Sequence, residues 1–185
     1  MTGTKIGIII GSLRVAAWTR KIAEQLIEMA PAGTAMHIIE IGNLPFYNED
    51  DETSSPPAAW TAFRKEVHDA DGIIFVTPEY NRSVPAVLKN AIDVGSRPYG
   101  KSVWNGKPCT IISSSVGVIG GFGANHHLRQ SMVTLSSPCM PSEHYLSYVQ
   151  KLFNDSGKFD DEKTAEFVRG FVKSSAAWIE KNAAH

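Results

Sequence analysis

The segment Gly11-Ser-Leu-Arg14 has the residue types and the position of a phosphate-binding loop. It directly follows an aliphatic run, residues 6–10, that predicts a strand, and it precedes an apolar pattern at helical spacing over residues 19–30. Backbone N–H groups and the dipole of a helix N-terminus attract an anion, and the side chains of Ser12 and Arg14 can add charge-assisted hydrogen bonds. The spacing matches neither G-x-G-x-x-G nor G-x-x-x-x-G-K-[ST], so it indicates neither a dinucleotide fold nor an NTPase. A plain structural turn is the alternative interpretation.

A second polar loop, Pro78-Glu-Tyr-Asn81, follows an apolar run over residues 72–76 that predicts a buried strand. A helix is predicted over residues 85–95, with Ser83 as its N-cap and Pro85 in its first turn, where a missing N–H costs nothing. Ligands of open α/β sheets bind outside the carboxyl ends of the strands. The sequence therefore predicts that this loop contacts a ligand.

Residues 113–123 form a third loop of the same kind, rich in serine and glycine. Glycines let the backbone approach a ligand closely, and serines offer small hydrogen-bonding groups. One phosphate loop and two loops rich in backbone donors suit a phosphorylated planar ring, against which Tyr80 could pack. Tyr80 could also be an ordinary half-buried tyrosine, and Glu79 could stabilise its own loop or a subunit contact.

Apolar runs and helical patterns alternate along the chain, which predicts a parallel sheet with right-handed crossovers. The expected fold class is α/β, a flavodoxin-like three-layer sandwich whose five-stranded parallel sheet has the order 2-1-3-4-5. We expect one domain over residues 1–185, because one charge pattern persists throughout. Strands are predicted over residues 6–10, 35–39, 72–76, 109–113 and 145–149, and helices over residues 19–30, 58–68, 85–95, 125–135 and 161–182.

Composition excludes several classes of partner. The chain has 185 residues, 43% of them hydrophobic and 20% charged, with a formal net charge of −1, so strong electrostatic binding to nucleic acid or to an acidic membrane is not expected. No apolar run approaches the roughly 20 residues that span a bilayer, and no signal peptide is recognised, so we expect a cytoplasmic protein. Cys109 and Cys139 lack C-x-x-C spacing and are expected to be buried free thiols. No residue near His126-His127 completes a metal site.

Taken together, these motifs resemble the NADPH-dependent FMN reductase family, in particular its branch of chromate and quinone reductases. Gly11-Ser-Leu-Arg14 is similar to the family's phosphate loop, and Pro78-Glu-Tyr-Asn81 is similar to its flavin loop. The resemblance extends over nearly the whole chain. Its other segments are Leu44-Pro-Phe-Tyr-Asn48, Leu88-Lys-Asn-Ala-Ile-Asp93, Gly120-Gly121 and His127-Leu-Arg-Gln130.

The resemblance implies an enzyme in which NADPH or NADH gives a hydride to bound FMN, which then reduces a small-molecule acceptor. Quinones are the expected acceptors, with chromate or azo compounds accepted incidentally. The cofactor carries such chemistry, which agrees with the lack of a recognisable triad or metal site, and no catalytic residue is assigned. The implied roles are Ser12, Arg14 and Thr19 at the phosphate, Pro78, Glu79, Tyr80 and Asn81 along the isoalloxazine, and Ser114, Ser115 and Gly117 at its other side or the ribityl chain.

The resemblance further implies a homodimer or homotetramer, in which Arg97, Tyr99 and Trp104 cover the flavin of a neighbouring subunit. The chain also departs from the family's pattern. Ala17 stands where relatives often have a serine, with Thr19 as the residue that could compensate. The usual Gly-Gly-x-Arg is here Gly121-Phe-Gly123, without the arginine, and Val94 replaces a tryptophan.

Three alternatives stay open at this point. The protein could reduce free FMN for a partner enzyme, which predicts weakly held flavin. It could be a flavodoxin-like electron carrier, although its near-neutral charge disfavours a carrier that docks by acidic surface. It could also be a flavin- or redox-responsive binding module without turnover.

Overall fold

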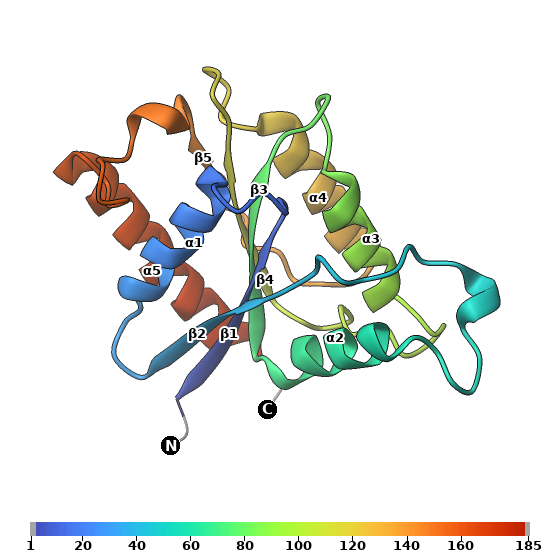
Figure 1. Ribbon diagram of the computed structural model, residues 1–185. Coiled ribbons are helices and arrows are strands. Elements are labelled where there is room, and N and C mark those ends of the chain that lie inside the picture. The colour runs from blue at the N-terminus through green and yellow to red at the C-terminus, as the bar shows by residue number, and fades with distance from the viewer. Residues whose placement is uncertain (1–2, 184–185) are drawn as a thin grey trace.

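The computed structural model describes residues 3–183, in which strands and helices alternate (Figure 1). Met1 and Thr2, which begin the segment inspected for a signal peptide, lie outside the described residues. The strands are β1 (Thr4–Ile10), β2 (Thr34–Ile39), β3 (Gly72–Pro78), β4 (Cys109–Ser114) and β5 (His144–Leu146). The helices are α1 (Trp18–Glu28), α2 (Ala58–Asp69), α3 (Ala86–Gly95), α4 (Phe122–Thr134) and α5 (Glu162–Asn182), with short 3₁₀ turns η1 (Glu49–Asp51) and η2 (Val149–Lys151).

All strand pairs of the sheet are parallel, and the order is β2-β1-β3-β4-β5. The predicted flavodoxin-like topology is therefore confirmed. Helices α1 and α5 cover one face, and α2, α3 and α4 cover the other, so the molecule has three layers (Figure 1). Both faces of a parallel sheet are buried in this way, which is why β1 and β3 read as continuous apolar runs and not as alternating patterns.

Two hydrophobic cores lie on either side of the sheet. Ile8 and Ile74 face α1 and α5, where Leu26 and Phe171 are fully buried. The opposite core contains Phe75, together with two large aromatic side chains, Trp60 and Trp104. The sheet is thereby fixed rigidly, and the loops at its carboxyl edge are held at defined positions.

Trp104 is a core residue, and the expectation that it covers a neighbouring flavin is wrong. Its side chain is 1% exposed, its indole N–H donates to the carbonyl of Ile92 at 2.9 Å, and its ring packs against Phe63 and Phe75. A Cβ at Gly95 would lie 2.6 Å from the indole, so the absence of a side chain there makes room for the tryptophan. Tyr99, in contrast, is 91% exposed.

Several predicted boundaries shift. Helix α3 begins at Ala86, after Pro85 as the N-cap residue, so Ser83 does not cap it. Helix α4 begins at Phe122, earlier than the apolar pattern indicates, and β5 ends at Leu146. None of the helices within residues 3–183 is long and apolar enough to cross a membrane.

Candidate functional site

Three loops converge where β1, β3 and β4 end at the carboxyl edge of the sheet. They surround a cavity of about 200 Å³. The cavity lies at the place where ligands of open α/β sheets bind. Its lining residues are Ser12, Arg14, Ala17, Trp18, Thr19, Pro78, Glu79, Tyr80, Ser114, Ser115, Val116 and Val149.

The N-terminus of α1 opens into this cavity without a cap of its own. Ala17 is the N-cap residue, so no side chain caps the helix, and its first turn contains no acidic residue. The Thr19 hydroxyl is buried and has no hydrogen-bond partner in the described part of the chain. Free first-turn N–H groups, the positive end of the helix dipole and this unpartnered hydroxyl together suit an anion. The nearby Arg14 guanidinium would add a positive charge.

The β3–α3 loop contains a tight two-residue turn. Tyr80 and Ser83 exchange both backbone hydrogen bonds, at 3.1 and 3.0 Å, so Asn81 and Arg82 form the corner. Both corner residues are left-handed, with φ of 51° and 64°, as a type I′ turn requires. Asparagine tolerates this conformation well, whereas arginine does so only at a cost. The turn therefore holds Tyr80, which is 47% exposed, at the rim of the cavity.

The Glu79 side chain stabilises this turn, because it contacts both α4 and Arg82. One carboxylate oxygen accepts hydrogen bonds from the backbone N–H groups of Gly123 and Ala124, at 2.7 and 3.2 Å, in the first turn of α4. The other oxygen pairs with Arg82 at 3.3 Å. The side chain is only 9% exposed. Glu79 thus caps α4 from a distant loop, which matches the loop-stabilising alternative that its sequence position left open.

Gly123 stands where the family's pattern has an arginine, and the structure leaves no room for a side chain there. A Cβ at this position would lie 2.6 Å from the Arg82 carbonyl oxygen and 3.0 Å from a Glu79 carboxylate oxygen. A side chain here would push the turn away from α4. The glycine therefore belongs with Glu79 and Arg82 as one unit that positions the β3–α3 loop.

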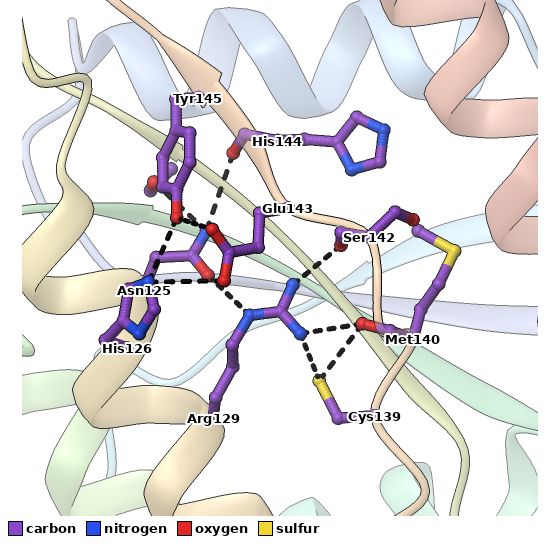
Figure 2. A network of polar contacts seen from close by, with 10 residues as sticks. Asn125, His126, Arg129, Cys139, Met140, Ser142, Glu143, His144 and Tyr145 are labelled. Carbon is purple, nitrogen blue, oxygen red and sulfur yellow. Dashed lines mark hydrogen bonds and ion pairs between the residues drawn. The ribbon is translucent and has the colours of Figure 1, made fainter.

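A buried polar chain holds the β4–α4 loop. The Ser113 hydroxyl donates to the Gly120 carbonyl at 2.9 Å and accepts from the Asn125 amide at 3.2 Å. The Asn125 carbonyl oxygen in turn accepts from Arg129 Nε at 2.8 Å (Figure 2). Gly120 and Gly121 are both left-handed, with φ of 58° and 82°, so the loop needs glycine at its entry into α4. These bonds fix the loop beside the cavity.

Most of the predicted ligand-binding residues meet at this cavity, but Asn81 and Gly117 are not among its lining residues. Asn81 forms the exposed corner of the turn, and Gly117 lies further along the β4–α4 loop, where its carbonyl accepts from Tyr148 N at 3.1 Å. Sequence reasoning missed three apolar contributors, Trp18, Val116 and Val149. Val149 could have been found, because it follows the last strand at the same edge of the sheet.

A larger hollow, of about 740 Å³, lies at the opposite edge of the sheet. Its lining includes Lys5 but also three acidic residues, Asp69, Asp71 and Glu180, whose excess negative charge disfavours a phosphate. The described residues contain no cluster of three His, Cys, Asp or Glu side chains that could hold a metal ion. The carboxyl-edge cavity is therefore the candidate site for an anionic ligand.

Comparison with known proteins agrees with this placement. Residues 4–151, which include all three loops, match the family model described as NADPH-dependent FMN reductase. The chain belongs to the NADPH-dependent FMN reductase family. The prediction that it is a reductase of this family is confirmed.

Relatives of this reductase carry names that specify the acceptor. A quinone reductase of Pseudomonas putida is 53% identical over 180 residues, covering 97% of this chain and 96% of the relative. A 2-hydroxy-1,4-benzoquinone reductase of a Burkholderia species is 40% identical, covering 95% of this chain and 96% of the relative. Both alignments extend over almost the whole of each protein.

Solved structures support the same assignment. The flavoenzyme FerB of Paracoccus denitrificans, an NAD(P)H:(acceptor) oxidoreductase, superposes with a TM-score of 0.88 at 34% identity and covers 98% of this chain and 100% of its own. A Pseudomonas aeruginosa flavodoxin superposes with a TM-score of 0.59 at 15% identity, covering 96% and 99%, which shows the common fold alone.

Proposed function

We propose that this reductase holds FMN in the carboxyl-edge cavity and uses it to reduce quinones at the expense of NADPH or NADH. The single observation that carries the proposal is the buried, unpartnered Thr19 hydroxyl at the uncapped N-terminus of α1, in the same cavity as Ser12 and Arg14. A buried polar group without a partner is costly, so its presence here favours a ligand that supplies acceptors. A phosphate has the oxygens and the charge that these donors need.

The phosphate end of the cofactor is assigned to the β1–α1 loop. The first-turn N–H groups of α1 and the hydroxyls of Thr19 and Ser12 would donate to phosphate oxygens. Arg14 balances the charge. Relatives often have a serine where this chain has Ala17, which lacks a hydroxyl. We assign the role of that hydroxyl to Thr19.

The ring end is assigned to the β3–α3 and β4–α4 loops. Pro78 and Tyr80 would contact the ring from one loop and Ser114 and Ser115 from the other, and backbone N–H groups of the two loops could donate to its polar atoms. When bound, FMN supplies the two-electron chemistry, taking a hydride from the nicotinamide and giving electrons to the acceptor. Backbone dipoles held in fixed positions would stabilise negative charge at that edge without reorganising. Asn81 and Gly117 do not line the cavity, and we assign them no direct contact with the ring.

The acceptor class follows from the relatives named quinone reductase and 2-hydroxy-1,4-benzoquinone reductase. A planar quinone can lie against the ring after the nicotinamide has left, in the space that Tyr80 borders. Donor and acceptor then use one site in turn, which predicts ping-pong kinetics. Chromate and azo compounds would be reduced incidentally.

We further propose that the chain acts as a single domain over residues 1–185, in the cytoplasm, as a homodimer or homotetramer. Two features favour assembly of the chain. Tyr99 is 91% exposed, and Arg97 and Tyr99 border a surface cavity of about 490 Å³. A light-scattering mass of one chain at working concentration would contradict the assembly.

The test is an anaerobic spectrum of the purified protein loaded with FMN. Rapid bleaching of the flavin bands by NADPH or NADH, followed by their return on addition of a benzoquinone, is the expected result. Bound flavin that neither nucleotide bleaches would identify an electron carrier or a binding module instead. Turnover that requires excess free FMN would identify a supplier of reduced flavin.

A further inference from the structure

The cysteines Cys109 and Cys139, 30 positions apart in the chain, are neighbours in the structure. Cys109 begins β4, and the segment around Cys139 runs parallel to it in an isolated bridge. Two backbone hydrogen bonds of 2.9 Å hold the pair, from Cys109 N to the Pro138 carbonyl and from Met140 N to the Cys109 carbonyl. Paired strands lie about 4.8 Å apart, which is within the roughly 4.4–6.8 Å of Cα separation that a disulfide spans. The backbone pairing therefore brings the two cysteines to a Cα separation that a disulfide can span.

The two thiols differ in exposure and in surroundings. Cys109 is 1% exposed within the core, whereas Cys139 is partly buried, and both are free. The neighbouring thiol and burial raise the pKa of Cys109 well above its ordinary value. Contact with Cys109 and the charge of Arg129 lower the pKa of Cys139, against the opposing effect of burial. Cys139 is thus the more reactive thiol of the pair.

Within residues 3–183, Arg129 forms no ion pair at contact distance, although its charge and that of the Glu143 carboxylate attract each other at longer range. Its Nη1 lies 3.5 Å from Cys139 Sγ (Figure 2). Its other hydrogen bonds within residues 3–183 all go to neutral oxygens: the Asn125 side chain at 2.8 Å and the carbonyls of Met140 and Ser142 at 2.7 Å each. These bonds fix the guanidinium in place beside the sulfur. A fixed, unpaired cation next to a partly exposed thiol, with a second thiol behind it, is the arrangement of a redox-active pair.

We propose that Cys139 is a peroxide-reactive thiol and that Cys109 resolves its oxidised form to an intramolecular disulfide. The oxidant is hydrogen peroxide. The Cys139 thiolate attacks one peroxide oxygen, the O–O bond breaks, and the departing hydroxide takes a proton to become water, leaving a sulfenic acid. The Cys109 thiol then attacks this sulfur, its proton passes to the departing hydroxyl as a second water, and the S–S bond forms. Two thiols lose two electrons, and the peroxide gains them.

The disulfide would close a ring over residues 109–139, which contains β4, the β4–α4 loop and α4. Arg129 would then face a disulfide sulfur in place of the free Cys139 thiol, while its bond to Asn125 remains. Since Asn125 holds Ser113 and thereby the loop at the cavity, the pair has a direct path to the site loop. Formation of this disulfide requires only the two thiols and peroxide, so it does not depend on FMN being the cofactor.

The test uses the reduced full-length protein, treated with a small excess of hydrogen peroxide and then alkylated after denaturation. The expected result is a monomer that has lost two hydrogens, takes up no alkyl group, and recovers both thiols with dithiothreitol. In the C109S variant, a dimedone adduct should form at Cys139. In the C139S variant, Cys109 should remain alkylatable. Two free thiols after treatment, a disulfide between chains, or dimedone at Cys109 in C139S would each overturn the proposal.

The contribution of Arg129 is tested with a matched pair of variants. Arg129→Gln removes the charge and should slow dimedone labelling in the C109S background by about tenfold, because a smaller fraction of Cys139 is then thiolate. Arg129→Lys keeps the charge and should recover most of the rate. Equal labelling rates in these two variants and in C109S itself would contradict the role of the guanidinium. Near-ultraviolet circular dichroism checks that each variant is folded.

Discussion

A carboxylate oxygen of Glu79 accepts a hydrogen bond of 2.7 Å from the backbone N–H of Gly123, although 44 positions separate the two residues. This bond joins the turn after β3 to the first turn of α4. The turn holds Tyr80 at the cavity, and α4 follows the loop whose Ser115 and Val116 line it, so the bond connects two of the cavity's loops. The loops of the site are thus held by interactions that are not local in sequence.

Replacing Glu79 should loosen this connection. Glu79→Gln keeps the shape but removes the negative charge from the N-terminus of α4 and from Arg82, and should cost about 1–2 kcal/mol in the free energy of unfolding. Urea denaturation measures the change. Stability equal to that of the parent protein would show that the bond does not connect the two elements energetically.

Adding a methyl group to Gly123 should have a similar effect for a steric reason. In Gly123→Ala the new Cβ would lie 2.6 Å from the Arg82 carbonyl oxygen, so the turn must move, at a cost of about 1–3 kcal/mol. Gly170→Ala is the matched control. Apart from its chain neighbours and the backbone of α5 itself, no atom lies within 4 Å of its Cβ position, and the helix should gain roughly 0.5–1 kcal/mol. A loss of stability in both variants would contradict the steric argument.

Replacing Thr19 should weaken FMN binding without lowering the stability of the FMN-free protein. Thr19→Val removes a buried hydroxyl that lacks a protein partner, so the protein without FMN should be as stable as the parent or more stable. Its FMN affinity should fall by about tenfold or more, because a hydrogen bond to a charged group contributes roughly 1.5–3 kcal/mol. Thermal unfolding and fluorescence titration measure the two quantities.

Thr110 provides the control for this variant. Its hydroxyl is also buried and without a partner among the described residues, but it lies in β4 and does not line the cavity. Thr110→Val should leave FMN affinity unchanged. If both valine variants weaken FMN binding alike, or if neither does, Thr19 does not contact the phosphate.

His144 should make stability depend on pH. Burial, with a contribution from the Arg129 charge, lowers the pKa of His144 below its ordinary value of 6.5, and its ring packs against Phe167 and Phe171. Below pH 6.5 the unfolded chain binds a proton there that the folded chain does not, so stability falls as the pH drops from 6.5 to the folded pKa. His144→Phe should flatten this part of the stability–pH curve. Parallel curves for parent and variant would contradict the assignment.

The fold could be predicted because its signals are local. Uninterrupted aliphatic runs such as residues 6–10 and 72–76 mark strands buried on both faces, and their alternation with helices allows few topologies. The predicted last strand, residues 145–149, extends beyond β5, which ends at Leu146, and the reason is again local. Tyr148 is left-handed, with φ of 49°, and Val149 N–H bonds to the Ser115 carbonyl instead of continuing the sheet, which an apolar pattern does not reveal.

The site could be predicted only in outline. The loops follow from the strand ends, and the polar residues in them follow from their types. The start of α4 at Phe122 could not be predicted in this way, because Glu79 from another loop caps its first turn. The contact between Cys109 and Cys139 and the burial of Trp104 also depend on distant partners. These features depend on contacts between distant segments, which the pattern of a single segment does not contain.

The central claim, that the uncapped N-terminus of α1 holds a phosphate, is tested most directly by comparing FMN with riboflavin. The two ligands share the ring and ribityl chain and differ only in the phosphate. Fluorescence titration of the FMN-free protein should give an affinity for FMN about 100-fold higher or more, since several charge-assisted bonds are involved. Arg14→Ala should reduce this ratio. Equal affinities for FMN and riboflavin would contradict the account, whatever the enzyme's activity.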